Sequence, residues 1–438
     1  MSLPAAVLLS GVFLSAGALA APAILVSPDP QPRDGFGLVV AAHDDLIAVG
    51  APGADTSIAE GYVHLYEFDG TAWQHAATLQ PPEGFTHEGF GLSIAIDAAR
   101  VVVGAPRADL NGFDDTGAAY VFVRTADGFR LEARLTAADA APRTGFGTSV
   151  ALDGGRLIVG ANGRIDEFGP PLGAAYVFEH DDTHGWQQHA RLQPAAYRDS
   201  LYGSEVALSA SSAAVGAPNN GVDGKGMVMF YVREDSGWFE NGIIAPELGA
   251  SLTSFASARM VMEGSRIAIS ADSDQASFGG AQGRVYVYER GADGWQEQAV
   301  LAPPSDEGHG FGWSLAMAGD HIAVTQTNGS QVFLFRRNAS GWSLIDTLAP
   351  EGFISVSRRA LALTANRLVV GSEGEAQVHE LAETADGNVT ASPDAGGDVV
   401  LIVEPIPERK SASGGGGIGG WLAFMLLALA PRLRVRRE

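Results

Sequence analysis

Ten histidines and 51 acidic residues are the side chains from which this chain could build a metal or catalytic site. The densest histidine cluster is His180-Asp181-Asp182-Thr183-His184. Imidazoles and carboxylates at such close spacing can bind a metal ion or transfer a proton. The cluster stands directly before Trp186, between two apolar segments, where polar residues gather in any hairpin turn. The sequence therefore favours a turn here over a metal or catalytic site.

Motifs typical of enzymes are missing elsewhere in the sequence. It contains no His-Glu-x-x-His zinc motif, no Gly-x-Ser-x-Gly nucleophile elbow and no Walker-type phosphate loop. Cysteine is absent, which excludes disulfides, cysteine-ligated metals and thiol catalysis. The formal net charge of −23 argues against a basic groove, so we expect no nucleic-acid partner. The same acidity would suit a cation or would simply keep the protein soluble.

A long internal repeat determines which elements would position any site. A glycine, or a residue in its place, recurs seven times after an apolar run, at spacings of 46 to 56 residues. These positions are Gly50, Gly104, Gly160, Gly216, Ser270, Thr325 and Gly371. A unit of this length accommodates four short strands, which is the content of one propeller blade.

Each unit repeats the same parts in the same order. An FG-like step opens an alternating strand, as at residues 146–152, and a tight polar turn follows at residues 153–155. The next run is apolar and ends in Val-Gly-Ala-Pro or a relative of it, which suits a strand buried on both faces. An aromatic third strand follows, and the fourth strand begins with one of Trp73, Phe129, Trp186, Trp238, Trp295 and Trp342. Because this aromatic residue recurs once per blade, the sequence favours packing between blades over a carbohydrate-binding platform.

The number of strands predicts how the ring closes. The sequence contains seven aromatic third strands, the last at residues 377–381, but only six aromatic-led fourth strands. We therefore predict that residues 23–28 supply the missing strand and pair with residues 376–381. The expected fold class is an all-β, seven-bladed β-propeller of four-stranded blades over residues 21–382, with the ring closed by the N-terminal strand. Closure removes the exposed sheet edges that an open array would have.

The motif Phe-Gly-x-Ser-(Val/Ile)-Ala, followed by (Val/Ile)-Val-Gly-Ala-Pro, resembles the FG-GAP repeat. Integrin α-chain propellers and many bacterial surface proteins carry this repeat. The resemblance extends over about residues 22–382 and is strongest in blades one to three. It weakens in blade four at Leu201-Tyr202-Gly203, in blade five at residues 254–257 and in blade seven at Ser357-Arg358. The resemblance implies a propeller displayed at a cell surface.

The resemblance also implies calcium. In integrin-like propellers some blades bind Ca²⁺ in the loop after Gly-Ala-Pro, through a pattern like Asp-x-(Asp/Asn)-x-(Asp/Asn)-Gly-x-x-Asp. The nearest match offers Asp109, Asn111, Asp114 and Asp115 and lacks one ligand position before the glycine. A second match has fewer candidate ligands and offers Asp272 and Asp274. Closely spaced oxygens suit a hard cation, but Asp and Asn are also ordinary turn formers, so both interpretations stay open.

The first 20 residues are expected to be a signal peptide. They are apolar and end in Ala18-Leu19-Ala20, a small-x-small triplet that signal peptidase requires, so cleavage is predicted after Ala20. The segment begins without Lys or Arg, which leaves an uncleaved membrane anchor as the alternative. We predict export across the inner membrane of a Gram-negative bacterium.

The C-terminus resembles a GlyGly-CTERM sorting signal. Residues 383–417 are expected to be a Gly/Ser/Pro-rich linker, and residues 418–438 a short apolar helix with a basic tail. Ten apolar residues from Trp421 to Ala430 span only about half of a bilayer core. The resemblance implies an intramembrane sorting protease as a partner, with membrane contact only through residues 418–438. A plain C-terminal anchor is the alternative.

The sequence as a whole predicts a non-catalytic binding or adhesion module at the cell surface or in the medium. Its partner would be an extracellular protein or a glycan, bound through the variable loops after each second strand. These loops are residues 53–60, 107–116, 162–172, 219–225 and 272–282. Two alternatives stay open: a propeller hydrolase that acts on an extracellular polymer or lipid, and a purely structural surface protein.

Overall fold

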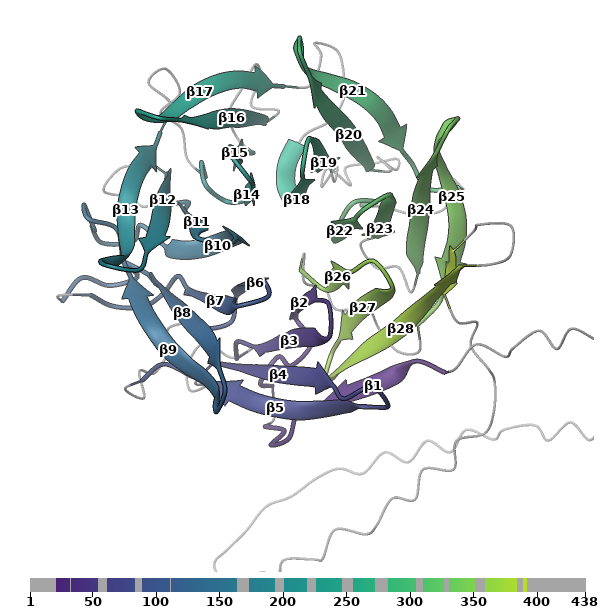
Figure 1. The fold of residues 1–438 in the computed structure, drawn as a ribbon, viewed down its shortest axis with the longest axis horizontal. Helices are drawn as coiled ribbons and strands as arrows, with labels where there is room; N and C mark the ends of the chain where they lie inside the picture. The colour runs from purple at the N-terminus through teal and green to yellow at the C-terminus, as the bar shows by residue number, and fades with distance from the viewer. Residues whose placement is uncertain are drawn as a thin grey trace, which may run out of the picture. The chain divides into compact units, whose positions relative to one another are not determined.

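The computed structural model describes residues 21–31, 33–53, 61–82, 89–110, 112–163, 173–193, 201–218, 226–245, 255–271, 283–304, 310–326, 331–350, 359–383 and 389–391. These residues form 29 strands and no helix. Seven antiparallel sheets stand around a central axis, with the first strand of each sheet nearest to the axis (Figure 1). The described chain is therefore an all-β, seven-bladed β-propeller, as the repeat predicted.

Blades one to three are meanders of four consecutive strands. Blade one contains β2 (Val39–His43), β3 (Leu46–Ala51), β4 (Tyr62–Phe68) and β5 (Trp73–Leu79). Blade two contains β6 (Ser93–Ile96), β7 (Arg100–Ala105), β8 (Ala118–Thr125) and β9 (Gly128–Leu135). Blade three contains β10 (Phe146–Asp153), β11 (Arg156–Ala161), β12 (Ala174–Asp181) and β13 (Gly185–Leu192).

Blades four to six repeat the same order. Blade four contains β14 (Val206–Ser209), β15 (Ser212–Ala217), β16 (Met227–Glu234) and β17 (Gly237–Ile244). Blade five contains β18 (Phe255–Glu263), β19 (Arg266–Ala271), β20 (Arg284–Gly291) and β21 (Gly294–Leu301). Blade six contains β22 (Leu315–Ala318), β23 (His321–Thr325), β24 (Val332–Asn338) and β25 (Gly341–Leu348).

Blade seven is assembled from both ends of the propeller sequence. It contains β26 (Leu361–Leu363), β27 (Arg367–Ser372) and β28 (Glu375–Glu383), with β1 (Ala23–Val26) as its outer strand. β1 pairs with β28 from Ala23 opposite Val378 to Val26 opposite Glu375, which confirms the predicted closure. The hydroxyl of Tyr66 in blade one donates to the Val26 carbonyl at 2.6 Å. β29 (Val389–Ala391) pairs with the end of β28, inside the segment expected to be a linker.

The second strand of each blade lies in the core. Every residue of β3, β15 and β27 is buried, and only the first residue of β7 and of β11 is partly exposed. A strand covered on both faces by neighbouring blades needs an uninterrupted apolar sequence. The Phe of the FG step then packs inside its own blade, with 5.4 Å between the ring centroids of Phe90 and Tyr120.

The glycines of the repeat lie where adjacent blades approach each other. A Cβ on Gly104 of blade two would lie 2.1 Å from the carbonyl oxygen of Gly147 in blade three. Gly147 itself has a φ of 95°, a conformation that side chains disfavour. The Ser93 hydroxyl donates to the same Gly147 carbonyl at 2.8 Å. Both motifs of the FG-GAP pattern therefore meet at the seam between two blades.

Residues 1–20 and 392–438, at the two ends of the chain, lie outside the described residues. No helix long and apolar enough to cross a membrane occurs in the described part of the chain. The predicted signal peptide at residues 1–20 and the predicted sorting segment at residues 418–438 both lie outside the described residues. All described residues belong to one compact unit, Met1–Ala395.

Candidate functional site

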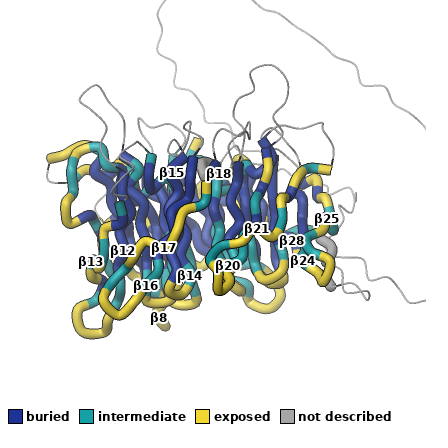
Figure 2. Tube along the Cα trace, turned by 90° about the horizontal axis from the view of Figure 1, so that it is seen from above, coloured by how far each residue is buried: buried dark blue, intermediate teal, exposed yellow. Residues whose placement is uncertain are grey.

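The two faces of the ring differ in the length of their connections. Within each blade, two to four residues join the first strand to the second and, in blades one to six, the third to the fourth, on the face where Figure 2 shows exposed turns. The connections between second and third strands leave from the other face, because the strands are antiparallel. They contain nine to twelve residues in blades one to five, six in blade six and two in blade seven. We name these two surfaces the turn face and the loop face.

The blade-two loop at residues 107–116 is the best described part of the loop face. Backbone hydrogen bonds join Leu110 and Phe113 in both directions, and the Thr116 hydroxyl donates to the Phe113 carbonyl at 3.0 Å. Asp109 accepts the backbone N–H of Asp115 at 3.0 Å. These bonds hold Phe113 with 46% of its surface exposed. The loop therefore presents an aromatic side chain on a framework of its own polar contacts.

The calcium prediction is only partly covered by the described residues. Asp109, Asp114 and Asp115 are described, whereas Asn111, Asp272 and Asp274 lie outside. Among the described residues, no group of three or more His, Asp or Glu side chains is arranged to hold a metal ion. The contact from Asp109 to the Asp115 backbone is the kind that also stabilises an ordinary turn. Calcium binding stays a prediction.

The histidine cluster of the sequence is divided between two environments. His184 lies 3.1 Å from Asp181 in its own turn, and the backbone N–H groups of His184 and Thr183 lower the pKa of Asp181. His180 points the other way, with its Nε2 3.7 Å from Glu132 of blade two. The two imidazoles share no partner, so they form a turn and an inter-blade contact, as the turn interpretation favoured.

The aromatic residue at the start of the fourth strand joins neighbouring blades. Trp186 of blade three donates its indole N–H to Glu132 of blade two at 2.9 Å, and Arg100 donates to the same carboxylate at 2.7 Å. Burial alone would raise the pKa of Glu132, but these donors and the charge of Arg100 outweigh it and lower the pKa. At the next seam, the Glu179 carboxylate accepts hydrogen bonds from Arg233 and Trp238. This confirms the predicted packing between blades.

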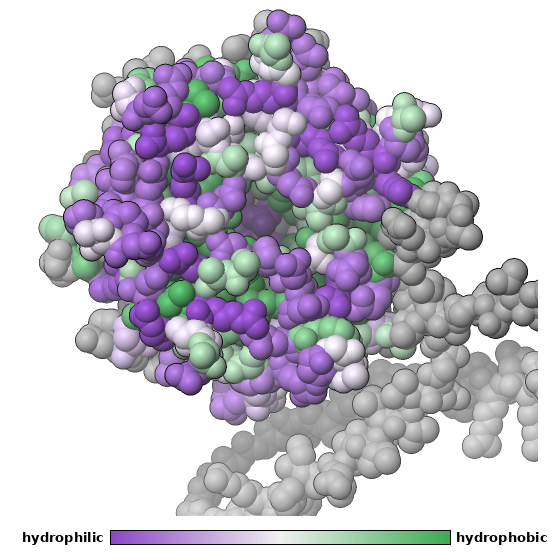
Figure 3. Space-filling view, viewed as in Figure 1, coloured by the Kyte–Doolittle hydropathy of each residue, from purple (hydrophilic) through white to green (hydrophobic). Residues whose placement is uncertain are grey.

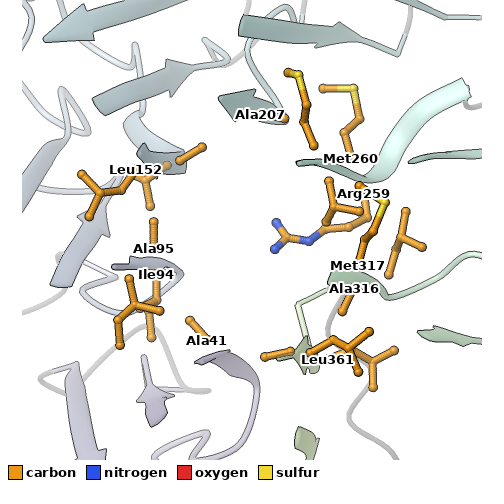
Figure 4. Close-up of a pocket in the computed structure, with 18 of the residues that line it drawn as sticks. Ala41, Ile94, Ala95, Leu152, Ala207, Arg259, Met260, Ala316, Met317 and Leu361 are labelled. Carbon is orange, nitrogen blue, oxygen red and sulfur yellow. The ribbon is translucent and has the colours of Figure 1, made fainter. Parts of the chain in front are cut away.

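A channel runs along the axis of the ring. Its cavity of ≈ 220 Å³ is lined by the first strands of all seven blades (Figure 4). Among the described lining residues, every side chain but one is aliphatic or a methionine, and the exception is Arg259 of blade five. Figure 3 shows the corresponding hollow at the centre of the ring. The described lining offers neither a nucleophile nor a carboxylate or imidazole base.

Charged residues meet at the loop-face end of this channel. Glu205 of blade four is buried, and its carboxylate accepts Arg259 at 3.2 Å and Arg359 of blade seven at 2.5 Å. Arg359 also donates to the Leu92 carbonyl of blade two at 3.2 Å. This group, which we name the Glu205 triad, connects four blades across the axis.

Sequence reasoning missed the Glu205 triad, although a signal was present. The strand register places Glu205 and Arg259 at the repeat position that Ser93 and Ser149 hold in blades two and three. A buried charged residue at a position where blades two and three have a small serine needs an opposite charge nearby. The partner could not be identified from the sequence because it comes from another blade.

The comparison with known families finds the repeat in the first three blades. Residues 21–66, 73–122 and 129–178 match the FG-GAP repeat. The first matched segment begins with β1, and the next two begin with the fourth strands β5 and β9. The chain therefore carries FG-GAP repeats, and β1 occupies the place of a fourth strand in that pattern. No curated protein matches the chain.

Solved structures share the propeller architecture at low sequence identity. The WD40 domain of Toxoplasma gondii coronin aligns with a TM-score of 0.53 and 9% identity, over 82% of this chain and 83% of that one. A putative 6-phosphogluconolactonase from Bacteroides uniformis gives 0.52 and 10%, over 80% and 95%. PorZ, a surface component of the type-IX secretion system of Porphyromonas gingivalis, gives 0.51 and 13%, over 81% and 48%. These likenesses describe the fold.

Proposed function

We propose that this FG-GAP propeller is an exported, non-catalytic module that binds an extracellular protein or a glycan on its loop face. The observation that carries the proposal is the difference between the two faces. Long connections gather on one face of a rigid ring, whereas the strand connections described within blades one to six on the other face are turns of two to four residues. Binding residues are commonly found on loops that a rigid scaffold positions.

The composition of the channel supports binding over catalysis. Propeller enzymes use the central channel because it collects side chains from all blades. Here the described lining is aliphatic apart from Arg259. The lactonase-like neighbour is 10% identical, so it shares a fold and gives no argument for its chemistry here. A hydrolase acting on an extracellular polymer or lipid is the competing proposal, and turnover in a panel of such substrates would favour it.

Loop exchange tests the binding face. The connection of blade two, residues 106–117, would be replaced by the Glu-Gly pair that joins β27 to β28 in blade seven. Binding of the native protein to arrays of extracellular proteins and glycans should be lost. In the matched control, replacement of the turn at residues 97–99 of the same blade should leave binding intact. Binding that survives the loop exchange and is lost in the control would overturn the proposal.

We also propose that the blade-two loop binds Ca²⁺ through Asp109, Asn111, Asp114 and Asp115. A calcium-dependent rise in melting temperature should disappear in Asp109→Ala. Asp127→Ala, in a hairpin turn of the same blade, is the control that should retain the rise. An equal rise in both variants would place the ion elsewhere.

Release of the protein from the cell is proposed to follow removal of its C-terminal segment. Mass spectrometry of the native secreted protein should show loss of residues beyond about 417, as a sorting protease would produce. An intact tail in the membrane fraction would instead support a plain anchor, with membrane contact through residues 418–438.

A further inference from the structure

The central channel combines an apolar wall with one guanidinium group. Its seven strands contribute side chains such as Ile94, Leu152, Met260 and Met317. Figure 4 shows the Arg259 guanidinium extending from β18 into the space between these walls. A cavity with this composition is suited to a molecule with one anionic end and an aliphatic body.

Arg259 has hydrogen-bonding capacity that its own partner does not use. Its side chain is 19% exposed, and one terminal nitrogen donates to Glu205 at 3.2 Å. Its Nε is buried and has no hydrogen-bond partner among the described residues. A guanidinium has five N–H donors, and a buried donor without an acceptor is costly. The guanidinium also has terminal N–H groups other than the one that bonds to Glu205, and these can donate to an anionic ligand in the channel.

Glu205 does not cancel this preference. Its carboxylate is shared between Arg259 and Arg359, so each guanidinium receives only part of one negative charge. The Glu205 triad therefore keeps a formal net charge of +1, and of its members Arg259 is the one that lines the channel.

We propose that the channel binds a small aliphatic carboxylate, with its head group on Arg259 and its chain along the inner strands towards the turn face. The cavity of ≈ 220 Å³ corresponds to roughly seven water-sized units, which is about the size of a six-carbon carboxylate. Inorganic anions would leave the apolar wall unfilled, and neutral or cationic chains would place no negative charge against Arg259. The site is separate from the loops of the proposed binding face.

Calorimetric titration of the purified full chain tests this proposal with four probes. Hexanoate should bind, and acetate should bind at least about tenfold more weakly because each buried methylene strengthens binding by about fourfold. Hexan-1-ol and hexylammonium should bind at least about tenfold more weakly than hexanoate, because neither has an anionic head. Absence of hexanoate binding at millimolar concentration, or equal binding of hexan-1-ol, would overturn the proposal.

Three variants assign the binding to the channel. Arg259→Gln should weaken hexanoate binding at least about tenfold, since hydrogen bonds to charged groups are the stronger ones. Arg266→Gln is the matched control, because Arg266 lies in the same blade and pairs with Asp320 outside the channel. Ala95→Leu places a larger side chain at the channel wall and should also abolish binding. Hexanoate binding that is unchanged in Arg259→Gln would overturn the proposal.

The outcome does not depend on Arg259→Gln folding. If that variant fails to fold, hexanoate binding by Ala95→Leu decides: loss of binding supports the channel, and unchanged binding places the ligand elsewhere. Folding of each variant is checked by its melting curve before titration.

Discussion

The seam between blades two and three and the seam between blades six and seven use the same repeat position differently. At the first seam, Gly104 lies against the carbonyl of Gly147, and the Ser93 hydroxyl donates to that carbonyl. At the second, Thr325 stands in the place of the glycine, and its hydroxyl accepts the backbone N–H of Ser314 at 3.0 Å.

The serine that lies opposite this glycine position also acts differently at the two seams. Ser93 donates to blade three, whereas Ser314 accepts the backbone N–H of Leu361 in blade seven at 3.1 Å. Glycine is needed where a neighbouring carbonyl approaches the strand, and a hydroxyl can take its place where it satisfies a backbone group. The repeat can therefore drift in sequence without losing the fold.

The closing seam between blades seven and one should be the most sensitive to deletion. Removal of residues 21–28 takes away β1, the buried Leu25 and the acceptor of the Tyr66 hydroxyl. We expect the melting temperature in calorimetry to fall by about 10 °C or more. Val26→Ser keeps the strand and changes a side chain that is 57% exposed, so it should melt like the parent. An unchanged melt after the deletion would contradict closure by β1.

Gly104→Ala should strongly destabilise the seam between blades two and three. The new Cβ would lie 2.1 Å from a backbone oxygen, so the two blades must separate. We expect a loss of about 3 kcal/mol or more in the free energy of unfolding, measured with denaturant. Gly291→Ala, at the end of β20, has open space around the Cβ position and no positive φ, so it separates this clash from the general cost of replacing glycine. Equal losses in both variants would refute the role of the seam.

Acid should weaken blade one more than its neighbours. His64 stands where blades two and three have Tyr120 and Tyr176, and burial, followed by the nearby His75, lowers its pKa to about 4. The unfolded chain takes up this proton near pH 6.5, so stability is lost as the pH falls from 6.5 towards 4. Between pH 7 and pH 5 the loss should be about 2 kcal/mol.

His64→Tyr introduces the residue that blades two, three and five have at this position, and it should remove this part of the pH dependence. Denaturant unfolding at pH 7 and pH 5 would measure it. His43→Tyr, a change at a partly exposed position of the same blade, is the control that should retain the dependence. An equal pH dependence in the parent and in His64→Tyr would contradict the assignment to His64.

Removing the serine hydroxyl should cost different amounts at the two seams. Ser314→Ala leaves the N–H of Leu361 buried without its acceptor, whereas Ser93→Ala leaves a carbonyl that has a second lone pair. We expect losses of about 2 kcal/mol for Ser314→Ala and about 1 kcal/mol for Ser93→Ala in denaturant unfolding. The reverse order would show that the two seams do not differ as described.

Much of the fold followed from local patterns in the sequence. The recurring glycines gave the number of blades, and the missing fourth strand gave the pairing of β1 with β28. Both features repeat at a fixed spacing, so each copy reinforces the others. The packing of the fourth-strand Trp was predictable for the same reason.

The partners of charged residues could not be predicted in this way. Glu132 meets Trp186 across 54 residues, and Glu205 meets Arg359 across 154 residues and the axis of the ring. Such pairs depend on how blades face each other and leave no local pattern. For the loop face, the length of each connection could be predicted from the repeat, whereas the contacts that hold Phe113 depend on the folded loop.

Hydrogen exchange on the native protein, with and without a partner found on the arrays, tests the central proposal most directly. The account predicts slower exchange in the loop-face segments 107–116 and 162–172 when the partner is bound. The hairpin turns at residues 97–99 and 153–155 of the same two blades should exchange at unchanged rates. Protection confined to those turns would contradict binding on the loop face.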